Sequence, residues 1–248
     1  MDVAKTESVV RLTGSVRTVH TMATTALLFG GSGLAAMALA AGGSGGVTIT
    51  CLLAAALMCG VLYQAPPFRW SYKGRGEPLC FVSFGPLATC GFYLAAVAAA
   101  AASPSAGTLG LSSISPAAVV ASILVGCTTT AILFCSHFHQ ETTDRAAGKQ
   151  SPIVRLGTAR AAKALRLGVL ATYATATLAA VAGALPLTVC AAALAAAPIA
   201  RVMLEFVTAN HGNPAVVFKA KFFATRWHAA HGLLLTLAFT AARLASLP

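Results

Sequence analysis

The residues best suited to chemistry lie together in one polar segment, from Ser136 to Gly157, which directly follows a long apolar run. This segment holds two of the six carboxylates in the chain, Glu141 and Asp144, and three cations follow close behind. If the preceding helix continues through the segment, Gln140 and Asp144 are four residues apart and Glu141 and Asp144 are three apart, so their oxygens share one face. Oxygen ligands on one face are suited to a hard divalent cation.

Two histidines, His137 and His139, open the same segment. An H-x-H pair could ligate a transition metal, but alternate residues lie far apart in angle around a helix, so both reach one ion only if the helix is distorted. We therefore interpret these histidines as hydrogen-bond partners, or as a base near a substrate, rather than as zinc ligands. The chain contains no P-loop, G-x-S-x-G or G-x-G-x-x-G pattern that would supply a competing chemistry.

A second candidate segment, from Tyr63 to Glu77, combines cations and aromatic side chains with paired prolines and two glycines. The prolines end a helix, and the glycines allow tight backbone turns. One interpretation is an aromatic belt at the membrane interface with positive charges beside it. The other is a pocket for an anionic head group and an aromatic acceptor, and composition alone leaves both open.

Contact with anionic lipid would by itself explain basic loops. The polar segment after His137 is different, because a lipid-binding patch gains nothing from Glu141 and Asp144. Acids that hold a cation, flanked by bases that hold phosphate oxygens, suit a diphosphate ester.

The composition indicates a membrane protein. The chain is 57% hydrophobic and 9% charged, with a mean hydropathy of +0.79, which is more apolar than a soluble core requires. The lipid bilayer is therefore an expected partner, and no nucleic-acid partner is expected. Apolar runs long enough to span the bilayer predict an all-α, polytopic transmembrane helix bundle. The seven predicted spans are Val16 to Ala41, Val47 to Ala65, Pro78 to Ala102, Ala117 to His137, Ala161 to Ala184, Leu185 to Val207 and His228 to Ala245.

The distribution of charge supports this count. With the gaps between spans assigned alternately to the two membrane faces, every Lys and Arg except Arg243 falls on one face, and all six carboxylates fall there too. The connections on the opposite face, such as residues 42–46 and 103–115, carry no charge. One face is therefore expected to carry the function.

The motifs of this face resemble those of a known family. Asp144 to Gly157 reads D-x-x-x-G-K-x-S-P-x-V-R-L-G and is similar to the second aspartate-rich region of the UbiA superfamily of intramembrane prenyltransferases. The preceding Ser136 to Gln140, the segment from Tyr63 to Pro78, and Phe84-Gly85-Pro86 resemble the cyanobacterial and plastid branch of its 1,4-dihydroxy-2-naphthoate prenyltransferases, the MenA group.

The resemblance implies a helical bundle of nine spans with two aspartate-rich loops above a lipid-facing cavity. It also implies that Mg²⁺ neutralises an isoprenoid diphosphate, and that ionisation gives an allylic cation. The electron-rich ring then attacks this cation at the carbon that bears the carboxylate, with loss of carbon dioxide. The implied partners are phytyl diphosphate and 1,4-dihydroxy-2-naphthoate, and the implied location is a chloroplast, thylakoid or cyanobacterial membrane, in phylloquinone or menaquinone biosynthesis.

Carried over residue by residue, the resemblance assigns four roles. The catalytic residues are Asp144, Glu141 and Lys149. The metal ligands are Asp144, Glu141 and Asp2. The diphosphate-binding residues are Lys5, Arg69, Lys149 and Arg155. The acceptor-binding residues are Tyr72, Lys73, His139 and Gln140.

Two departures from the family pattern bear on these roles. Gln140 stands where much of the superfamily has an aspartate. The first motif of the family is N-D-x-x-D followed by G-x-D, and Asp2 matches only the segment from that last aspartate onward. Residues 1–248 are therefore expected to form a single transmembrane domain without the N-D-x-x-D motif and the first two spans of the family.

Alternatives of two classes stay open at this point. The acceptor could be homogentisate or a chlorophyllide. The chain could also be a non-catalytic homologue or a carrier. A carrier should bury polar groups in the middle of its spans, and the sequence predicts almost none there.

Overall fold

The computed structural model describes residues 16–101 and 109–245, and within these ranges the chain is helical, with no strand. The all-α prediction is therefore confirmed. The long helices are α3 (Val16–Ala41), α4 (Gly43–Gln64), α7 (Pro116–His137), α10 (Thr158–Val181) and α14 (Ala220–Ala245). Two further stretches consist of shorter helices in succession: α5 (Gly76–Val82), the π-helix η2 (Ser83–Thr89) and α6 (Cys90–Ala101), then α11 (Leu187–Ala195) and α12 (Ala197–Asn210). The connections contain η1 (Trp70–Lys73), η4 (Leu111–Ser113), η5 (Phe138–Gln140), α8 (Glu141–Ala146), α9 (Pro152–Leu156) and α13 (Pro214–Val217).

Six helical stretches of the described chain are long and apolar enough to cross a membrane, and each coincides with a predicted span. The seventh predicted span, from His228, is also helical and forms much of α14. Its polar residues, including His231 and Arg243, leave it less apolar than the other six. The six are Thr24–Ala41, Gly43–Gln64, Gly76–Ala100, Pro116–Ala146, Thr158–Val181 and Leu187–Asn210. The protein is an integral membrane protein with several spans.

The described residues divide into two compact units. The smaller takes its residues from Met1–Ala55 and Gly91–Ile114, and the larger from Ala56–Cys90 and Ser115–Pro248. All the described residues with predicted roles belong to the larger unit. A single transmembrane domain over residues 1–248 stays a prediction.

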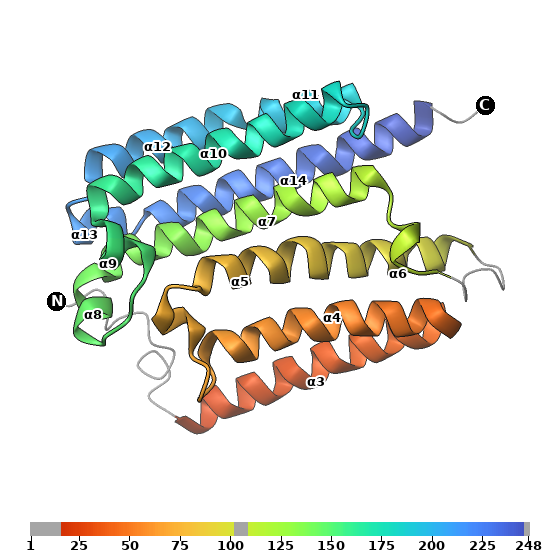
Figure 1. Cartoon of the computed structure of the whole chain (residues 1–248), viewed down its shortest axis with the longest axis horizontal. Coiled ribbons are helices and arrows are strands. Elements are labelled where there is room, and N and C mark those ends of the chain that lie inside the picture. Colours follow the sequence, from red (N-terminus) through yellow and green to blue (C-terminus); the bar gives the residue numbers. More distant parts are fainter. Residues whose placement is uncertain (1–15, 102–108, 246–248) are drawn as a thin grey trace. The chain divides into compact units, whose positions relative to one another are not determined.

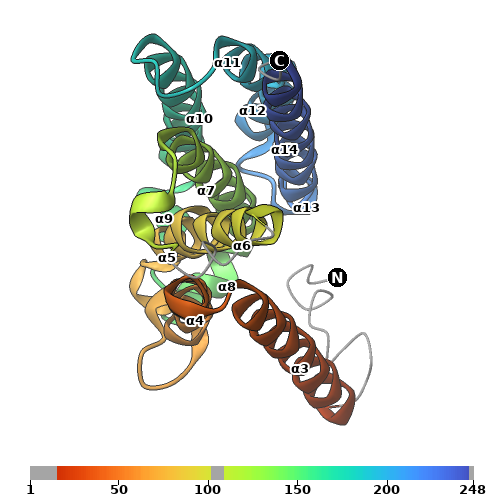
Figure 2. The same ribbon diagram turned by 90° about the vertical axis from the view of Figure 1, so that its right-hand side faces the viewer.

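Helix α7 runs through the middle of the larger unit, where it packs against α5, α10 and α14 (Figure 1). In Figure 2, α10, α11, α12 and α14 lie on one side of α7, and α5 lies on the other. Cys135, Leu165, Met203 and Trp227 fill the space between α7, α10, α12 and α14, and each is at most 5% exposed. Close packing of this kind is what holds helices together in a lipid environment.

Two glycines bring α7 into direct contact with the α5–η2 stretch. A Cβ atom added to Gly85, in η2, would lie 2.8 Å from the carbonyl oxygen of Ser122 and 3.0 Å from the Cα of Gly126. A Cβ atom added to Gly126, in α7, would lie 2.9 Å from the ring of Phe81. Because small residues let helix backbones approach closely in a membrane, these glycines fix the spacing of the two helices.

In the smaller unit, a single residue, Gly42, joins α3 to α4. Gly42 and Gly43 have φ values of +60° and +46°, which glycine adopts without steric cost. A Cβ atom on Gly46 would collide with the carbonyl oxygen of Ala38, so the start of α4 lies against the end of α3. The connection predicted over residues 42–46 is therefore shorter than expected, because α4 already begins within the glycine-rich run.

Candidate active site

Two basic connections of the larger unit meet at one end of its helices. One joins α4 to α5, and the other runs from the end of α7 to the start of α10 (Figure 1). The backbone N–H of Gln150, in the second, donates a hydrogen bond to the carbonyl oxygen of Tyr72, in the first, at 2.9 Å. Ser71 is buried beside Tyr72, and its hydroxyl donates to the side-chain oxygen of Gln64 at 3.3 Å. The two loops are thus joined directly through their backbones.

Gly74 permits this close approach. Its φ of +70° lies in the left-handed region, which favours glycine. A Cβ atom at this position would lie 2.6 Å from the carbonyl oxygen of Gln150 and 3.0 Å from Nη1 of Arg155. The Arg155 side chain therefore covers Gly74. As a result, a residue predicted to bind the diphosphate lies against the first loop.

Arg69 and Tyr72, which were predicted to bind the diphosphate and the acceptor respectively, contact each other. The Arg69 guanidinium carbon lies 3.9 Å from the centre of the Tyr72 ring, a cation–π geometry. Arg69 also has a φ of +42°, an unusual conformation for a residue with a side chain. Such conformations persist only where the surrounding structure imposes them, and they concentrate at functional sites. Lys73 is exposed on the same loop.

A chain of four polar side chains crosses the junction of the loops. Glu77, at the start of α5, and His137, at the end of α7, bring Oε1 and Nδ1 within 2.9 Å of each other. His137 Nε2 lies 3.2 Å from the ammonium nitrogen of Lys149. The same ammonium nitrogen lies 3.3 Å from Oδ2 of Asp144. All four side chains are at most 14% exposed.

The neighbours of His137 define its tautomer. The Lys149 ammonium can only donate, so Nε2 must accept and carries no hydrogen. The carboxylate of Glu77 can only accept, so the hydrogen lies on Nδ1. His137 is therefore a neutral ring that Glu77 orients and that in turn orients the Lys149 ammonium group. This is the hydrogen-bond role expected for His137 from sequence.

Asp144 is held at the end of this chain. It is 8% exposed, and its backbone carbonyl accepts from the Lys149 N–H at 2.8 Å. Its buried Oδ2 accepts no hydrogen bond of good geometry, and the ion pair with Lys149 is its charged contact. A buried carboxylate oxygen with spare acceptor capacity is unusual, and a bound cation is one explanation of it.

Glu141 makes a different contact from Asp144. Its Oε1 accepts a hydrogen bond from Nη2 of Arg145, one turn along α8, at 2.7 Å. The predicted continuation of the helix is interrupted by the short helix η5, and α8 starts at Glu141 itself. Within residues 16–101 and 109–245, no three His, Cys, Asp or Glu side chains are grouped to hold a metal. The other two residues of the predicted site, Asp2 and Lys5, lie outside the described residues.

His139 and Gln140 occupy the η5 turn. His139 is buried, and its ring packs edge-on against Phe218, with 6.5 Å between ring centres. Gln140 is half-buried, and its carbonyl oxygen accepts from the Thr143 hydroxyl at 2.9 Å. Their assignment to acceptor binding stays a prediction.

An apolar cavity of about 280 Å³ lies next to this polar end, between the last turns of α4, α5 with η2, and α7. Tyr63 links the cavity to the polar chain, because it lines the cavity while its ring packs on Gly76, the neighbour of Glu77. The cavity is lined by Cys59, Gly60, Tyr63, Leu79, Cys80, Ser83, Phe84 and Leu133.

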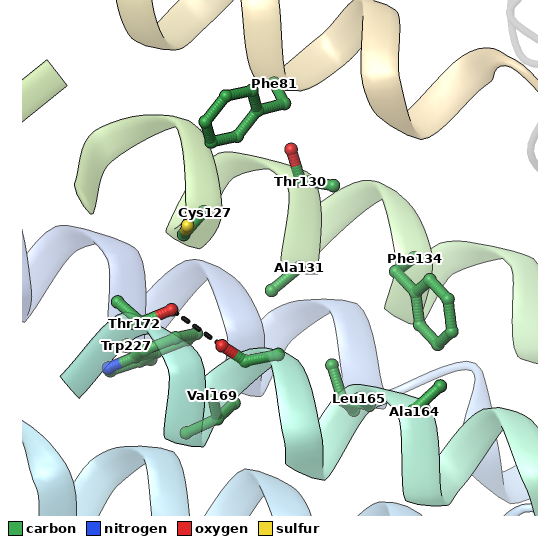
Figure 3. Close-up of a pocket in the computed structure, with 11 residues that line it drawn as sticks. Phe81, Cys127, Thr130, Ala131, Phe134, Ala164, Leu165, Val169, Thr172 and Trp227 are labelled. Atoms are coloured by element: carbon green, nitrogen blue, oxygen red, sulfur yellow. Dashed lines mark hydrogen bonds between the residues drawn. The ribbon is translucent and has the colours of Figure 1, made fainter. Parts of the chain in front are cut away.

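A second cavity, of about 180 Å³, lies between α5, α7, α10 and α14 (Figure 3). Phe81, Phe134 and Trp227 supply its aromatic lining, and Thr172, which also lines it, donates a hydrogen bond within α10.

Polar groups are buried within the bundle, contrary to the sequence-based prediction. Trp227 Nε1 donates to the Tyr173 hydroxyl at 3.0 Å. Thr128 Oγ1 lies 2.9 Å from His228 Nδ1. His231 is 1% exposed, and neither ring nitrogen has a hydrogen-bond partner. The prediction was wrong because these residues lie on three different helices, and only the fold brings them together.

Sequence reasoning did not identify Glu77 as a hydrogen-bond partner of His137. Sixty residues separate them in the chain. One signal was available, because Glu77 is one of six carboxylates in an apolar chain and needs a partner where it is buried.

Comparison with known proteins adds to these observations. The chain is 40% identical, over 98% of its length, to a protein of Arabidopsis thaliana named 2-carboxy-1,4-naphthoquinone phytyltransferase, chloroplastic. It is 37% identical, over 96% of its length, to the 2-carboxy-1,4-naphthoquinone phytyltransferase of Synechocystis sp.. The chain spans 61% of the length of the first relative and 72% of the second. No solved structure gives a significant match.

The family assignment follows from the match of the chain itself. Residues 14–242 match the UbiA prenyltransferase family, a range that includes both loops, the four-residue polar chain and both cavities. A multi-span helical bundle with acids and bases at one end of its helices is consistent with that match. The chain belongs to the UbiA prenyltransferase family.

Proposed function

We propose that this protein transfers a phytyl group from its diphosphate to 1,4-dihydroxy-2-naphthoate, with loss of the carboxylate as carbon dioxide. The family and the names of the two relatives support this class of reaction. The observation that carries the proposal is the buried ion pair of Lys149 and Asp144 at the junction of two basic loops. A cation and an acid side by side suit a metal-bound diphosphate. We assign the protein to a chloroplast or cyanobacterial membrane, in line with the sources of the relatives.

Basic side chains from both loops would hold the diphosphate. Lys149 lies within the buried chain, while Arg69 and Arg155 are exposed beside it on the two joined loops. Guanidinium groups bind phosphate oxygens through paired hydrogen bonds, and an ammonium binds them as a point charge. The stacking of Arg69 on Tyr72 and the packing of Arg155 on Gly74 limit the freedom of both guanidinium groups. We assign Lys5, outside the described residues, to the same role.

Members of the family generally use a divalent metal ion, and we propose Mg²⁺. The residues present fit this ion, because the spare acceptor oxygen of Asp144 is a hard ligand. Proteins usually hold Mg²⁺ through one or two carboxylates together with substrate phosphates. Glu141 would join the site by leaving Arg145, and Asp2 would complete it. When bound, the ion neutralises charge on the departing diphosphate.

The reaction balances as the replacement of a carboxylate by a phytyl group. The allylic C–O bond breaks, and its electron pair leaves with the diphosphate. The ring carbon bearing the carboxylate forms the new C–C bond, after which the bond to the carboxylate breaks, returns its electron pair to the ring and releases carbon dioxide. Lys149 stabilises the leaving diphosphate, and the apolar cavity beside Tyr63 keeps water from the allylic cation.

The oxidation state of the acceptor is part of the proposal. The names of the relatives specify a 2-carboxy-1,4-naphthoquinone. We propose the reduced, dihydroxy form for this chain, because attack on an allylic cation needs an electron-rich ring. Assays with the acceptor kept reduced by dithionite, and with the oxidised acceptor, distinguish the two forms.

The test is a transfer assay on membranes that contain this chain, with phytyl diphosphate, Mg²⁺ and the reduced naphthoate, and product detection by mass spectrometry. We expect a prenylated naphthoquinone and free diphosphate, and we expect Asp144→Asn to abolish both. Glu205→Gln is the matched control, because Glu205 pairs with Arg201 on the exposed surface of α12. The proposal fails if the Synechocystis relative forms product and this chain forms none. Product from homogentisate or a chlorophyllide alone would change the assigned acceptor.

A non-catalytic carrier for an isoprenoid or an anion is the second candidate. The polar side chains buried within the bundle, above all His231, favour it, because intramembrane polar groups commonly mark ligand pathways. A carrier would bind phytyl diphosphate without releasing inorganic diphosphate, and a diphosphate-release assay on the same membranes measures this.

A further inference from the structure

We infer that Glu77 and His137 are positioning residues that hold the Lys149 ammonium group ready to receive the diphosphate of the prenyl donor. The inference rests on the proposed function, because it requires a diphosphate ligand at Lys149. Neither Glu77 nor His137 has to touch the donor, because each acts through the next member of the chain.

The geometry gives the order in which these side chains act: Glu77 orients His137, and His137 orients Lys149. The carboxylate of Glu77 lies 2.9 Å from His137 Nδ1 and fixes the tautomer of the ring. The lone pair of Nε2 then points at the ammonium group of Lys149, 3.2 Å away. Carboxylate–histidine pairs orient metal ligands in the same way, with a lysine here in the place of the metal.

Lys149 needs this support because of its place in the fold. It lies in the connection between α8 and α9, directly after Gly148, whose φ is +71°. A lysine ammonium on a flexible four-carbon stem is not oriented by its own backbone. Asp144 also holds it, but Asp144 is the proposed metal ligand. Once a metal-bound diphosphate engages that carboxylate, His137 is the contact that still fixes the ammonium.

A purely structural role for the pair would be to join α5 to α7. That contact is already made by the close approach at Gly85 and Gly126. The third member of the chain, Lys149, belongs to neither helix. The arrangement is therefore better explained by the position of the ammonium group than by helix packing.

The experiment measures the binding of inorganic diphosphate, in the presence of Mg²⁺, to the purified chain in detergent. We expect Glu77→Leu and His137→Leu each to raise the Kd by about tenfold or more, because each removes a charge-assisted hydrogen bond from the chain. Glu77→Gln keeps an oxygen acceptor for His137 and should recover most of the affinity. His211→Leu is the matched control, because His211 hydrogen-bonds the Thr158 hydroxyl at 3.0 Å and is not one of the four linked polar side chains. This substitution should leave the Kd unchanged.

Folding is followed by circular dichroism and thermal unfolding of every variant. His137→Asn provides a second test, because asparagine is polar and adds no apolar group at this buried position. Its short amide cannot reach both Glu77 and Lys149, so the chain of contacts is broken. It should raise the Kd like His137→Leu. The inference is overturned if folded His137→Asn and Glu77→Leu bind diphosphate as tightly as the wild type, whatever their stability.

Two results separate this inference from the proposed function. Diphosphate binding that depends on His137, without any prenylated naphthoquinone, rejects the proposed reaction and supports the positioning role. If the wild type transfers phytyl, and the His137→Asn variant has the same Kd for diphosphate and the same KM for the donor as the wild type, the positioning role alone is rejected. Absence of diphosphate binding in the wild type rejects both.

Discussion

The buried ion pair of Lys149 and Asp144 should be strongly coupled, and single and double substitutions measure this coupling. The two charged atoms lie 3.3 Å apart, and the side chains are 14% and 10% exposed. At an effective dielectric constant of about 20, two unit charges at this distance attract each other by about 5 kcal/mol. Removing one partner of a buried pair typically costs about 3–5 kcal/mol, because the other charge is left without compensation.

The two single variants should differ in cost. Lys149→Met leaves a buried carboxylate whose Oδ2 accepts no hydrogen bond, so its cost should lie in that range of about 3–5 kcal/mol. Asp144→Asn leaves Lys149 with His137 Nε2 and with an amide oxygen, so its cost should be about 1–3 kcal/mol. The double variant removes both charges and should be more stable than the sum of the single costs by about 1–3 kcal/mol.

The assay is reversible unfolding of the purified chain in mixed micelles, followed by circular dichroism. The matched control is the pair of Arg201 and Glu205, whose atoms lie closer, at 2.7 Å, but whose side chains are 80% and 61% exposed. Breaking that pair should change the free energy of unfolding far less, because an exposed ion pair is screened and contributes little. Additive single costs in the double variant, or a Lys149→Met variant as stable as Asp144→Asn, would refute the reasoning.

Three further outcomes are expected. Gly74→Ala should weaken the junction of the loops and lower activity, since its Cβ would lie 2.6 Å from the Gln150 carbonyl oxygen. Gly148→Ala, with a similar φ but no atom near its Cβ, should show only the backbone cost of about 1 kcal/mol, and hydrogen exchange at the Gln150 amide compares the two. Gly60→Leu should fill the 280 Å³ cavity and raise the KM for phytyl diphosphate relative to geranyl diphosphate, whereas Gly168→Leu, in the second cavity, should not. Chelation by EDTA should stop transfer, and added Mg²⁺ should restore it; full activity in EDTA would contradict the metal assignment.

The helices follow from the sequence because a bilayer imposes a simple rule on length and apolarity. Helix α3 occupies the predicted range, Val16 to Ala41, and α7 starts one residue before the prediction. Arg69, Tyr72 and Arg155 were predicted as site residues, and the structure brings them onto two joined loops.

Pairings between distant residues could not be predicted in the same way. The spacing of Glu141 and Asp144 indicates a shared helix face, but Glu141 pairs with Arg145 and Asp144 pairs with Lys149. Local periodicity does not encode which cation a carboxylate selects. The partnership of Glu77 with His137 depends on the glycine contact between two helices, which only the folded chain reveals.

That glycine contact also limits which parts of the protein can tolerate larger side chains. Any side chain at Gly85 or Gly126 would push apart α5, which holds Glu77, and α7, which holds His137, because backbone or ring atoms lie within 3.0 Å of the added carbon. At Gly60, by contrast, an added carbon meets nothing within 4 Å. A saturation library should therefore accept almost no replacement at the first two positions and many at the third. Variants selected for a new donor length would then change on the α4 wall of the cavity, while the spacing of Glu77 and His137 stays constant.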